Sequence, residues 1–406
     1  MPTSIELFTG AGGLALGVAA AGFDHQMLVE YNRDACRSLR INLAHLAGEQ
    51  TALHEGDVRQ VNFDAFRDRV DLLAAGAPCQ PFSIGGKHRA HSDERNLFPE
   101  VFRAVAAVRP KAVVIENVKG LLRESFRPYV DYIELQLSRP DVQPLDAEDW
   151  GEHAAVLRAL QSEDTGSNLR YVVRKQLLNA ADFGVPQRRE RVFIVAVRAD
   201  LEEAWPGLSP THSEDALLYE QWVTGEYWKR HRIARPGIPQ QLERRVERLA
   251  MIGRPATKPW RTVRDALAES PRLGEPTMGS GTKGVLNHVG QPGARSYPGH
   301  TGSPVDEPAK TLKAGVHGVP GGENMLRQLD GTVRYFTIRE AARMQSFPDD
   351  YVIEGSWSEA LRQLGNAVPM RLAQAVAQSV RDLLERHKMP SNGRRLGAKS
   401  TRLVSA

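Results

Sequence analysis

Cysteine is scarce in this chain, with two residues, Cys36 and Cys79, among 406. So few cysteines exclude a disulfide framework as the main source of stability, and Cys79 is expected to be a free thiol in a reducing compartment. Long hydrophobic runs are also missing. The most apolar stretch, residues 10–23, is too short to span a bilayer, is interrupted by glycines and has no basic segment before it. We therefore expect a cytoplasmic protein with no membrane partner.

A strong charge bias is lacking as well. The formal net charge is +4 and the pI is about 9.0, because basic and acidic residues nearly balance. This balance permits a polyanionic partner but does not require one. The hydrophobic content of 41% and the charged content of 25% are typical of a globular protein, and the length suggests two or three domains.

The first two hundred residues alternate short apolar runs with amphipathic stretches. This alternation predicts an α/β fold built on a doubly wound, mostly parallel sheet. The expected strands are residues 4–8, 27–30, 71–75, 111–116 and 191–197. A looser, proline-broken stretch at about 123–168 is interpreted as a helical insertion into this first domain, residues 1–198.

The chain changes character after residue 198. Scattered prolines, tryptophans and a glycine-rich stretch predict a second, irregular domain of loops and short strands over residues 199–332. Residues 333–388 are expected to return to the first domain, with a capped helix starting at Thr337 and a final helix that buries an apolar stripe. The basic tail, residues 389–406, is expected to be disordered.

A glycine-rich turn, residues 8–14, follows the first expected strand and opens a helix. Its glycines permit a tight turn and the close approach of a ligand to the backbone. Glu30 and Asp57 end neighbouring strands, where one carboxylate can accept ribose hydroxyls and the other an adenine amino group. Each carboxylate alone would be an ordinary surface residue or helix cap. Together with the turn they describe an adenosine pocket without a lysine for a polyphosphate, which favours S-adenosylmethionine over ATP.

Cys79 follows the expected strand at 71–75 and is held by Pro78 on an exposed loop. A free cysteine is usually a small core residue, but the polar, glycine-containing and basic segment 83–89 that follows is poor core material and suits a lid. The thiolate is a strong nucleophile, so cations nearby would suffice to activate Cys79.

Two further segments carry groups suited to a reacting base. Glu116 ends the strand expected beside the one that leads to Cys79, and a partly desolvated carboxyl there can protonate a ring nitrogen. Period-two alternation places Gln187, Arg189 and Arg191 on one face. These arginines are either a salt-bridged edge or anchors for a carbonyl oxygen and a phosphate.

Six segments in chain order together resemble motifs of the DNA cytosine 5-methyltransferases, the bacterial modification enzymes that methylate carbon 5 of cytosine. These segments are Phe8–Gly13, Gly76–Ser83, Glu116–Val118, Gln187–Arg191, Arg339–Pro348 and Gly365–Pro369. The resemblance covers nearly the whole chain outside the insertion and the variable region. Departures are slight, such as Glu6 where the family often has aspartate.

The resemblance implies a methyltransferase fold that binds S-adenosylmethionine, a target-recognition role for residues 199–332, and a cytosine rotated out of duplex DNA. Cys79 would attack carbon 6 while Glu116 protonates the ring nitrogen, and Gln187, Arg189 and Arg191 would complete the catalytic set. The cofactor pocket would be formed by Phe8, Gly10, Gly12, Gly13, Glu30, Tyr31, Asp57, Val58, Pro78, Leu97, Asn366 and Val368. DNA contacts would come from Gln80, Ser83, Lys87, Arg89 and Thr311. No metal is implied.

The expected partner is duplex DNA, bound by a nucleoid-associated monomer, and a restriction endonuclease acting on the same site is a candidate partner. A relative that methylates cytosine in RNA is a rival, although the long variable region favours duplex DNA. A silent DNA-binding module would be expected to have lost Cys79, Glu116 or Arg189. A dinucleotide-dependent oxidoreductase would need a glycine spacing that this chain lacks.

Overall fold

The computed structural model describes residues 1–46, 51–78, 96–144, 149–160, 169–270, 272–279, 281, 284–314 and 322–388. At its centre is a seven-stranded sheet with strand order β3-β2-β1-β4-β5-β7-β6. The strands are β1 (Thr3–Leu7), β2 (Asp24–Glu30), β3 (Ala52–Glu55), β4 (Leu72–Ala75), β5 (Ala112–Val118), β6 (Tyr171–Asn179) and β7 (Glu190–Arg198). β1 to β5 pair in parallel, and β7 is antiparallel to both of its neighbours. The predicted mostly parallel sheet is confirmed.

The inner strands β4, β5 and β7 contain continuous apolar runs because both faces of the sheet are covered. Every residue of β4 is buried, and so is every residue of β5 up to Asn117. The edge strand β6 is different, since Arg174 and Lys175 in its middle are exposed. No strand was expected at β6 or at the short edge strand β3, because neither forms a continuous apolar run.

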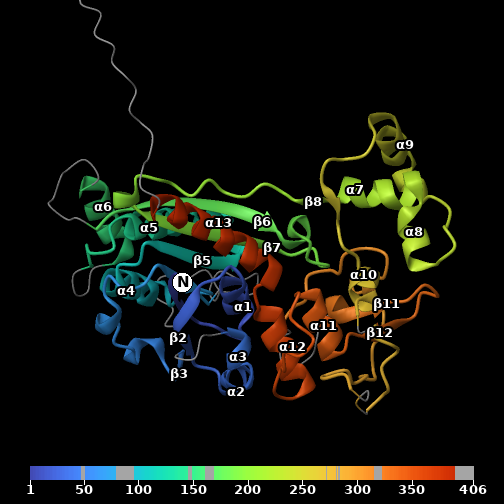
Figure 1. Ribbon diagram of the computed structural model, residues 1–406, viewed down its shortest axis with the longest axis horizontal. Helices are drawn as coiled ribbons and strands as arrows, with labels where there is room; N and C mark the ends of the chain where they lie inside the picture. The colour runs from blue at the N-terminus through green and yellow to red at the C-terminus, as the bar shows by residue number, and fades with distance from the viewer. Residues whose placement is uncertain are drawn as a thin grey trace, which may run out of the picture.

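Helices cover the two faces of the sheet (Figure 1). α1 (Gly13–Ala20) and α13 (Met370–Lys388) pack together on one face, where α13 buries the predicted stripe of leucine and valine residues. α4 (Phe98–Val108) and α5 (Arg127–Ser138) cover the other face, and α6 (Trp150–Leu160) packs against α5. α5 and α6 are the helices expected between residues 123 and 168. α2 (Arg33–Ile41) and α3 (Leu43–Leu46) lie beside β3 and α1.

The expectation of loops and short strands was wrong for the first half of the second region. The chain from 214 to 252 forms a helical lobe of α7 (Glu214–Leu218), a π-helical turn (Tyr219–Thr224), α8 (Glu226–His231) and α9 (Glu243–Ile252). These helices pack around Trp222, Tyr227 and Trp228. The lobe was missed because each helix is short and is flanked by the prolines that suggested loops. Ser213 starts the lobe by capping α7, with its side chain accepting from the N–H of Ala216.

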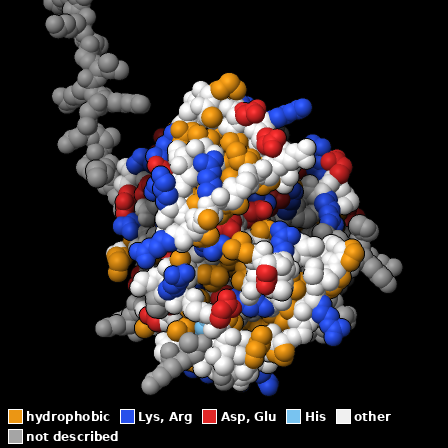
Figure 2. All heavy atoms as spheres, turned by 90° about the vertical axis from the view of Figure 1, so that its right-hand side faces the viewer, with side chains coloured by type: hydrophobic (Ala, Val, Ile, Leu, Met, Phe, Trp, Pro, Cys, Tyr) orange, Lys and Arg blue, Asp and Glu red, His pale blue; other side chains and the backbone are white. Residues whose placement is uncertain are grey.

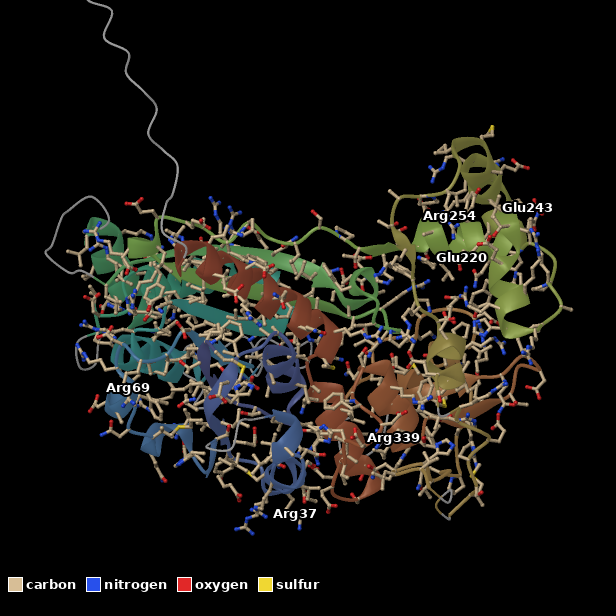
Figure 3. The ribbon with its side chains drawn as sticks, in the orientation of Figure 1. Arg37, Arg69, Glu220, Glu243, Arg254 and Arg339 are labelled. Carbon is tan, nitrogen blue, oxygen red and sulfur yellow. The ribbon has the colours of Figure 1, made fainter. Side chains whose placement is uncertain are left out.

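Short elements join the helical lobe to the rest of the chain. They are β8 (His212–Ser213), β9 (Lys258–Pro259) and α10 (Val263–Ala268). The Tyr227 hydroxyl donates to Asp306 Oδ1 over 2.8 Å and lies 2.9 Å from Thr262 Oγ1. Arg264 Nε pairs with Asp306 Oδ1 at 2.6 Å. Figure 3 shows Glu220, Glu243 and Arg254 in the lobe, at the opposite end of the molecule from Arg69.

The described residues between 272 and 314 are irregular, as predicted. These described residues contain one strand, β10 (Ser303–Pro304). It joins β11 (Met325–Arg327) and β12 (Val333–Tyr335) in a small sheet. Seen from this end (Figure 2), Lys and Arg side chains are interspersed with hydrophobic side chains around a hollow. This end of the molecule therefore presents a mixed surface, on which acidic side chains also appear.

The final segment brings the chain back to the large sheet. α11 (Ile338–Met344) starts with the predicted cap, a reciprocal capping box between Thr337 and Glu340. α12 (Trp357–Asn366) follows, and one apolar core joins Leu28 of β2 to Phe336 and Tyr351. The C-terminal segment thus packs directly on the N-terminal strands. Within the described residues, no helix is long and apolar enough to cross a membrane.

Candidate active site

The glycine-rich turn connects β1 to α1 at the carboxyl end of the sheet. Gly10 and Gly12 have φ angles of 56° and 86°, a left-handed conformation that favours glycine. A Cβ atom on Gly10 would meet no protein atom within 4 Å, so the backbone faces open space there. The Gly10 N–H donates to Glu30 Oε2 over 2.7 Å, which fixes the turn to the end of β2.

The predicted carboxylates lie at neighbouring strand ends. Glu30 Oε1 also accepts from the N–H of Asn32 over 2.7 Å, so both of its oxygens are oriented by the backbone. Asp57 caps a short 3-10 helix, accepting from the N–H of Arg59 over 3.0 Å. Tyr31 lies at the rim and is 77% exposed. These residues line one continuous pocket together with Phe8, Val58, Pro78 and Leu97.

Glu116, near the end of β5, forms an ion pair with Arg191 at the start of β7. The Glu116 Oε1–Arg191 Nε distance is 2.7 Å, and both side chains are nearly buried. The pair forms because β5 and β7 are antiparallel neighbours, which brings these two strand ends together. Burial raises the pKa of the Glu116 carboxyl, and the positive charges of Arg191 and Arg189 partly oppose that rise. The Glu116 carboxyl therefore binds a proton more readily than an exposed glutamate does.

The neighbouring residue, Asn117, fixes the chain that leads to Cys79. Its side-chain amide donates to the Ala77 carbonyl over 3.2 Å. Because β4 and β5 are adjacent in the sheet, Pro78 opens onto the same pocket as Glu116. Cys79, Gln80, Ser83, Lys87 and Arg89 lie outside the described residues, as does the rest of 79–95.

Gln187 and Arg189 are buried and face the interior, as the alternation predicted, whereas Arg188 between them is exposed. The salt bridge of Arg191 to Glu116 matches one of the two roles expected for the arginines, whereas Gln187 and Arg189 bind backbone carbonyls. Gln187 Nε2 donates to the Met344 carbonyl over 3.1 Å, and the Arg189 guanidinium donates to backbone carbonyls instead of facing an acidic edge. Thr311 is half-buried at the pocket and donates from Oγ1 to the Arg188 carbonyl over 2.7 Å.

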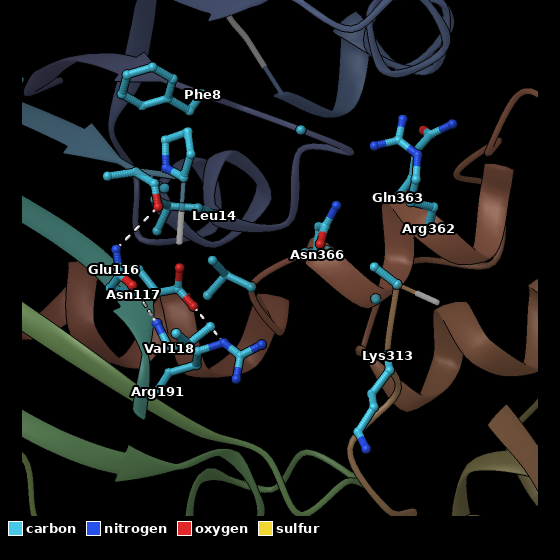
Figure 4. A pocket seen from close by; sticks show the side chains of 18 of the residues that line it. Phe8, Leu14, Glu116, Asn117, Val118, Arg191, Lys313, Arg362, Gln363 and Asn366 are labelled. Carbon is cyan, nitrogen blue, oxygen red and sulfur yellow. Dashed lines mark hydrogen bonds and ion pairs between the residues drawn. The ribbon is translucent and has the colours of Figure 1, made fainter. Parts of the chain in front are cut away.

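The opposite wall of the pocket comes from the last third of the chain (Figure 4). Asn366 and Val368 line it as predicted, and Gly12 and Gly13 lie behind it, where a Cβ on Gly13 would be 2.2 Å from the Val368 carbonyl oxygen. Sequence reasoning missed several residues of this wall because no motif marks them. They are Tyr297, His300, Lys313, Glu323, Arg362 and Gln363.

The pocket is large for a single small ligand. Its volume is about 1820 Å³, compared with roughly 300–1,000 Å³ for a typical small-molecule site. One side offers an aromatic ring, exposed backbone and carboxylates suited to a nucleoside, and the other side contains the Glu116–Arg191 pair. This arrangement has room for a cofactor and a second reactant side by side.

Comparisons with known proteins agree with this geometry. The model of the family described as C-5 cytosine-specific DNA methylase matches residues 3–141 and 157–382. The chain is 32% identical over 389 residues to the type II methyltransferase M.Eco47II of Escherichia coli, covering 95% of this chain and 80% of the relative. It is 29% identical over 387 residues to the type II methyltransferase M.NgoMIV of Neisseria gonorrhoeae, covering 93% and 96%.

A solved structure shares the fold. The Dnmt2 methyltransferase of S. pombe superimposes with a TM-score of 0.52 and 18% identity, covering 96% of this chain and 100% of that one. The family match extends through both walls of the pocket and through the strands that carry them. The chain therefore belongs to the C-5 cytosine-specific DNA methylase family, and it is a DNA (cytosine-5) methyltransferase.

Proposed function

We propose that this enzyme transfers the methyl group of S-adenosylmethionine to carbon 5 of a cytosine rotated out of duplex DNA, through a covalent bond to Cys79. The observation that supports this proposal best is the buried Glu116–Arg191 pair in the pocket. Glu116 lies on β5, the strand next to β4, and β4 leads into Cys79. A proton donor and a thiol would then reach the same ring from adjacent strands.

The residues around the glycine-rich turn fit S-adenosylmethionine. Phe8 offers a ring for the adenine, Glu30 oxygens can accept from ribose hydroxyls, and the open backbone at Gly10 leaves room for close approach. Asp57 and Asn366 supply polar groups at either end of this region. When bound, the cofactor supplies an electrophilic methyl group.

Different pocket residues would act on different atoms of the cytosine ring. The Cys79 thiolate would form a bond to carbon 6, and Glu116 would protonate the ring nitrogen, so that carbon 5 becomes electron-rich. Arg191 keeps the Glu116 carboxyl in place through their 2.7 Å contact. After carbon 5 has gained the methyl group, with S-adenosylhomocysteine as the leaving group, loss of the carbon 5 proton to solvent and elimination of the Cys79 thiolate would restore the double bond. The ring nitrogen would return its proton to Glu116, which frees the enzyme for another turnover.

Duplex DNA would bind at the mouth of the pocket. Extrusion of a base costs a few kcal/mol of stacking and pairing, which protein contacts must offset. The residues proposed to supply these contacts are Thr311, which lines the pocket, and Gln80, Ser83, Lys87 and Arg89, which follow Cys79 in the sequence. A restriction endonuclease that cuts the same sequence is proposed as a functional partner, since the relatives above are type II methyltransferases.

Bisulfite sequencing of DNA from a host that expresses the protein tests this function. We expect cytosines in one sequence context to resist conversion, and we expect the Cys79→Ser variant to lose this protection while it still binds S-adenosylmethionine, because the thiol contacts the base and not the adenosine. A correctly folded Cys79→Ser protein that still protected the same cytosines would contradict the covalent mechanism. If bisulfite converted every cytosine in DNA from a host that expresses the unaltered protein, that result would contradict the activity itself.

A further inference from the structure

The segment 309–314 belongs to the second region of the chain, and its residues 311–314 line the pocket. The segment is held against the residues that precede β7. The Ala309 N–H donates to the Pro186 carbonyl over 2.9 Å, and the Arg188 N–H donates to the Ala309 carbonyl over 2.8 Å. The Leu312 N–H donates to Gln187 Oε1, also over 2.8 Å. The 309–314 segment is therefore held to 186–188 by an isolated parallel bridge between Gln187 and Ala309 and by the Gln187 side chain.

One guanidinium ties this segment to the cofactor side of the pocket. Arg189 Nη1 donates to the Leu312 carbonyl over 2.8 Å. Arg189 Nη2 donates to the carbonyls of Gly365 and Ala367 over 2.6 and 3.0 Å. Arg189 is 0% exposed, so these contacts are shielded from water. A single planar group thus bridges two segments that are far apart in the sequence.

The same two segments also touch directly. A Cβ on Gly365 would lie 2.3 Å from the Ala314 backbone nitrogen, so only glycine fits at this contact. The turn continues into Asn366 and Val368, which line the pocket, and Val368 in turn abuts Gly13 of the glycine-rich turn. Because these contacts are close, a displacement of the 365–368 turn would also move the 309–314 segment.

This geometry also limits what Arg189 can do in catalysis. To reach a phosphate or a base, its guanidinium would have to leave three carbonyls that it satisfies in the interior. Arg191, two residues later, is the arginine that pairs with Glu116 at the pocket. The two arginines of this motif consequently have different roles.

We propose that Arg189 is a positioning residue that couples cofactor binding at the 365–368 turn to DNA binding at the 309–314 segment. This inference rests on the proposed function, in which S-adenosylmethionine and duplex DNA occupy the two sides of the pocket. Since coupling between two ligands is reciprocal, DNA tightens cofactor binding by the same factor as the cofactor tightens DNA binding.

The test is calorimetric titration of S-adenosylhomocysteine into the protein, alone and with a duplex that carries the sequence found protected by bisulfite sequencing. For the unaltered protein we expect the duplex to tighten binding about 5-fold or more. In Arg189→Lys the charge is kept, but one ammonium cannot span the same carbonyls, so the ratio should fall to about 1. The matched control is Arg188→Gln, an exposed neighbour whose side chain pairs with Glu214, and it should keep the original ratio.

A ratio of 1 in the unaltered protein, or an unchanged ratio in Arg189→Lys, would overturn the coupling role. If the unaltered protein bound no S-adenosylhomocysteine or protected no cytosine, the proposed function would fail instead.

A second measurement needs no variant and covers the case in which Arg189→Lys does not fold. Hydrogen exchange of the unaltered protein should slow at the amides of 310–313 when S-adenosylhomocysteine is added without DNA. Exchange that slows only around Phe8, Glu30 and Asp57 would refute the link.

Discussion

Glu116 is the residue whose chemistry depends most directly on its surroundings. Burial raises its pKa, so a larger fraction of the carboxyl is protonated at a given pH than for an exposed glutamate. As pH rises through that pKa the protonated fraction falls, and methyl transfer should fall with it. Glu116→Gln should lower kcat by about 10²- to 10⁴-fold and remove this alkaline decline, with little change in the Kd for DNA.

The measurement is the pH dependence of single-turnover methyl transfer for both proteins. Glu124→Gln, at an exposed glutamate that pairs with Arg127 at 3.4 Å, serves as the control and should behave like the unaltered enzyme. Unchanged turnover in a folded Glu116→Gln protein would remove Glu116 from the mechanism.

For individual residues, the sequence predicted the face on which a side chain lies but not the groups to which it hydrogen-bonds. Alternation correctly put Gln187, Arg189 and Arg191 on one buried face. It could not show that Arg189 binds Leu312 and the turn at 365–367, because those carbonyls are more than a hundred residues away in the chain. Cys36 is buried in α2, where it packs as a small apolar side chain.

At the scale of the elements, α1 and α13 pack so closely that Gly17 of α1 has no room for a side chain. A Cβ on Gly17 would lie 2.4 Å from Ala373 Cβ and 2.6 Å from the Gln374 backbone nitrogen. Gly17→Ala should therefore force the helices apart and lower the free energy of unfolding by about 1–3 kcal/mol, despite the better helix propensity of alanine. Urea unfolding measures this loss. Gly237→Ala, where the Cβ meets open space, is the control, and equal stability of both variants would contradict the packing argument.

Strands and helices were predictable where burial leaves a simple pattern. The strands β4, β5 and β7 are buried on both faces, so each contains a continuous apolar run. β1 is as deeply buried but includes the polar residues Ser4 and Glu6. The edge strand β6 and the short helices of the helical lobe do not have such patterns, and both were missed. Their structure depends on partners supplied by other parts of the chain, such as the aromatic cluster around Trp228.

At the scale of the whole molecule, the helical lobe depends on polar contacts for its position. Asp265 of α10 pairs with His231 of α8 at 2.8 Å and with Arg230 at 3.3 Å. Although burial opposes ionisation, these contacts and the Thr262 N–H lower the pKa of Asp265 to about 2. Since the folded pKa lies below the unfolded value, this stabilisation is complete above about pH 4 and is lost as pH falls toward 2.

Asp265→Asn should thus destabilise the lobe by about 2 kcal/mol at neutral pH, given roughly 1.4 kcal/mol per pKa unit. Hydrogen exchange within 214–252 measures the effect, which should vanish when both proteins are compared near pH 2. Glu247→Gln, on the exposed face of α9, is the control. Lobe amides that exchange at the same rate in the Asp265→Asn and unaltered proteins at pH 7 would show that other contacts hold the lobe.

The pocket is built from both ends of the polypeptide, since the turn that bears Asn366 and Val368 closes against the loop after β1. During synthesis, a ribosome will have released the strands bearing Pro78 and Glu116 long before it translates this closing turn. An incompletely translated or prematurely terminated enzyme would hence carry most of its chemistry without a finished nucleoside site. Modification of the genome would begin only with completed molecules.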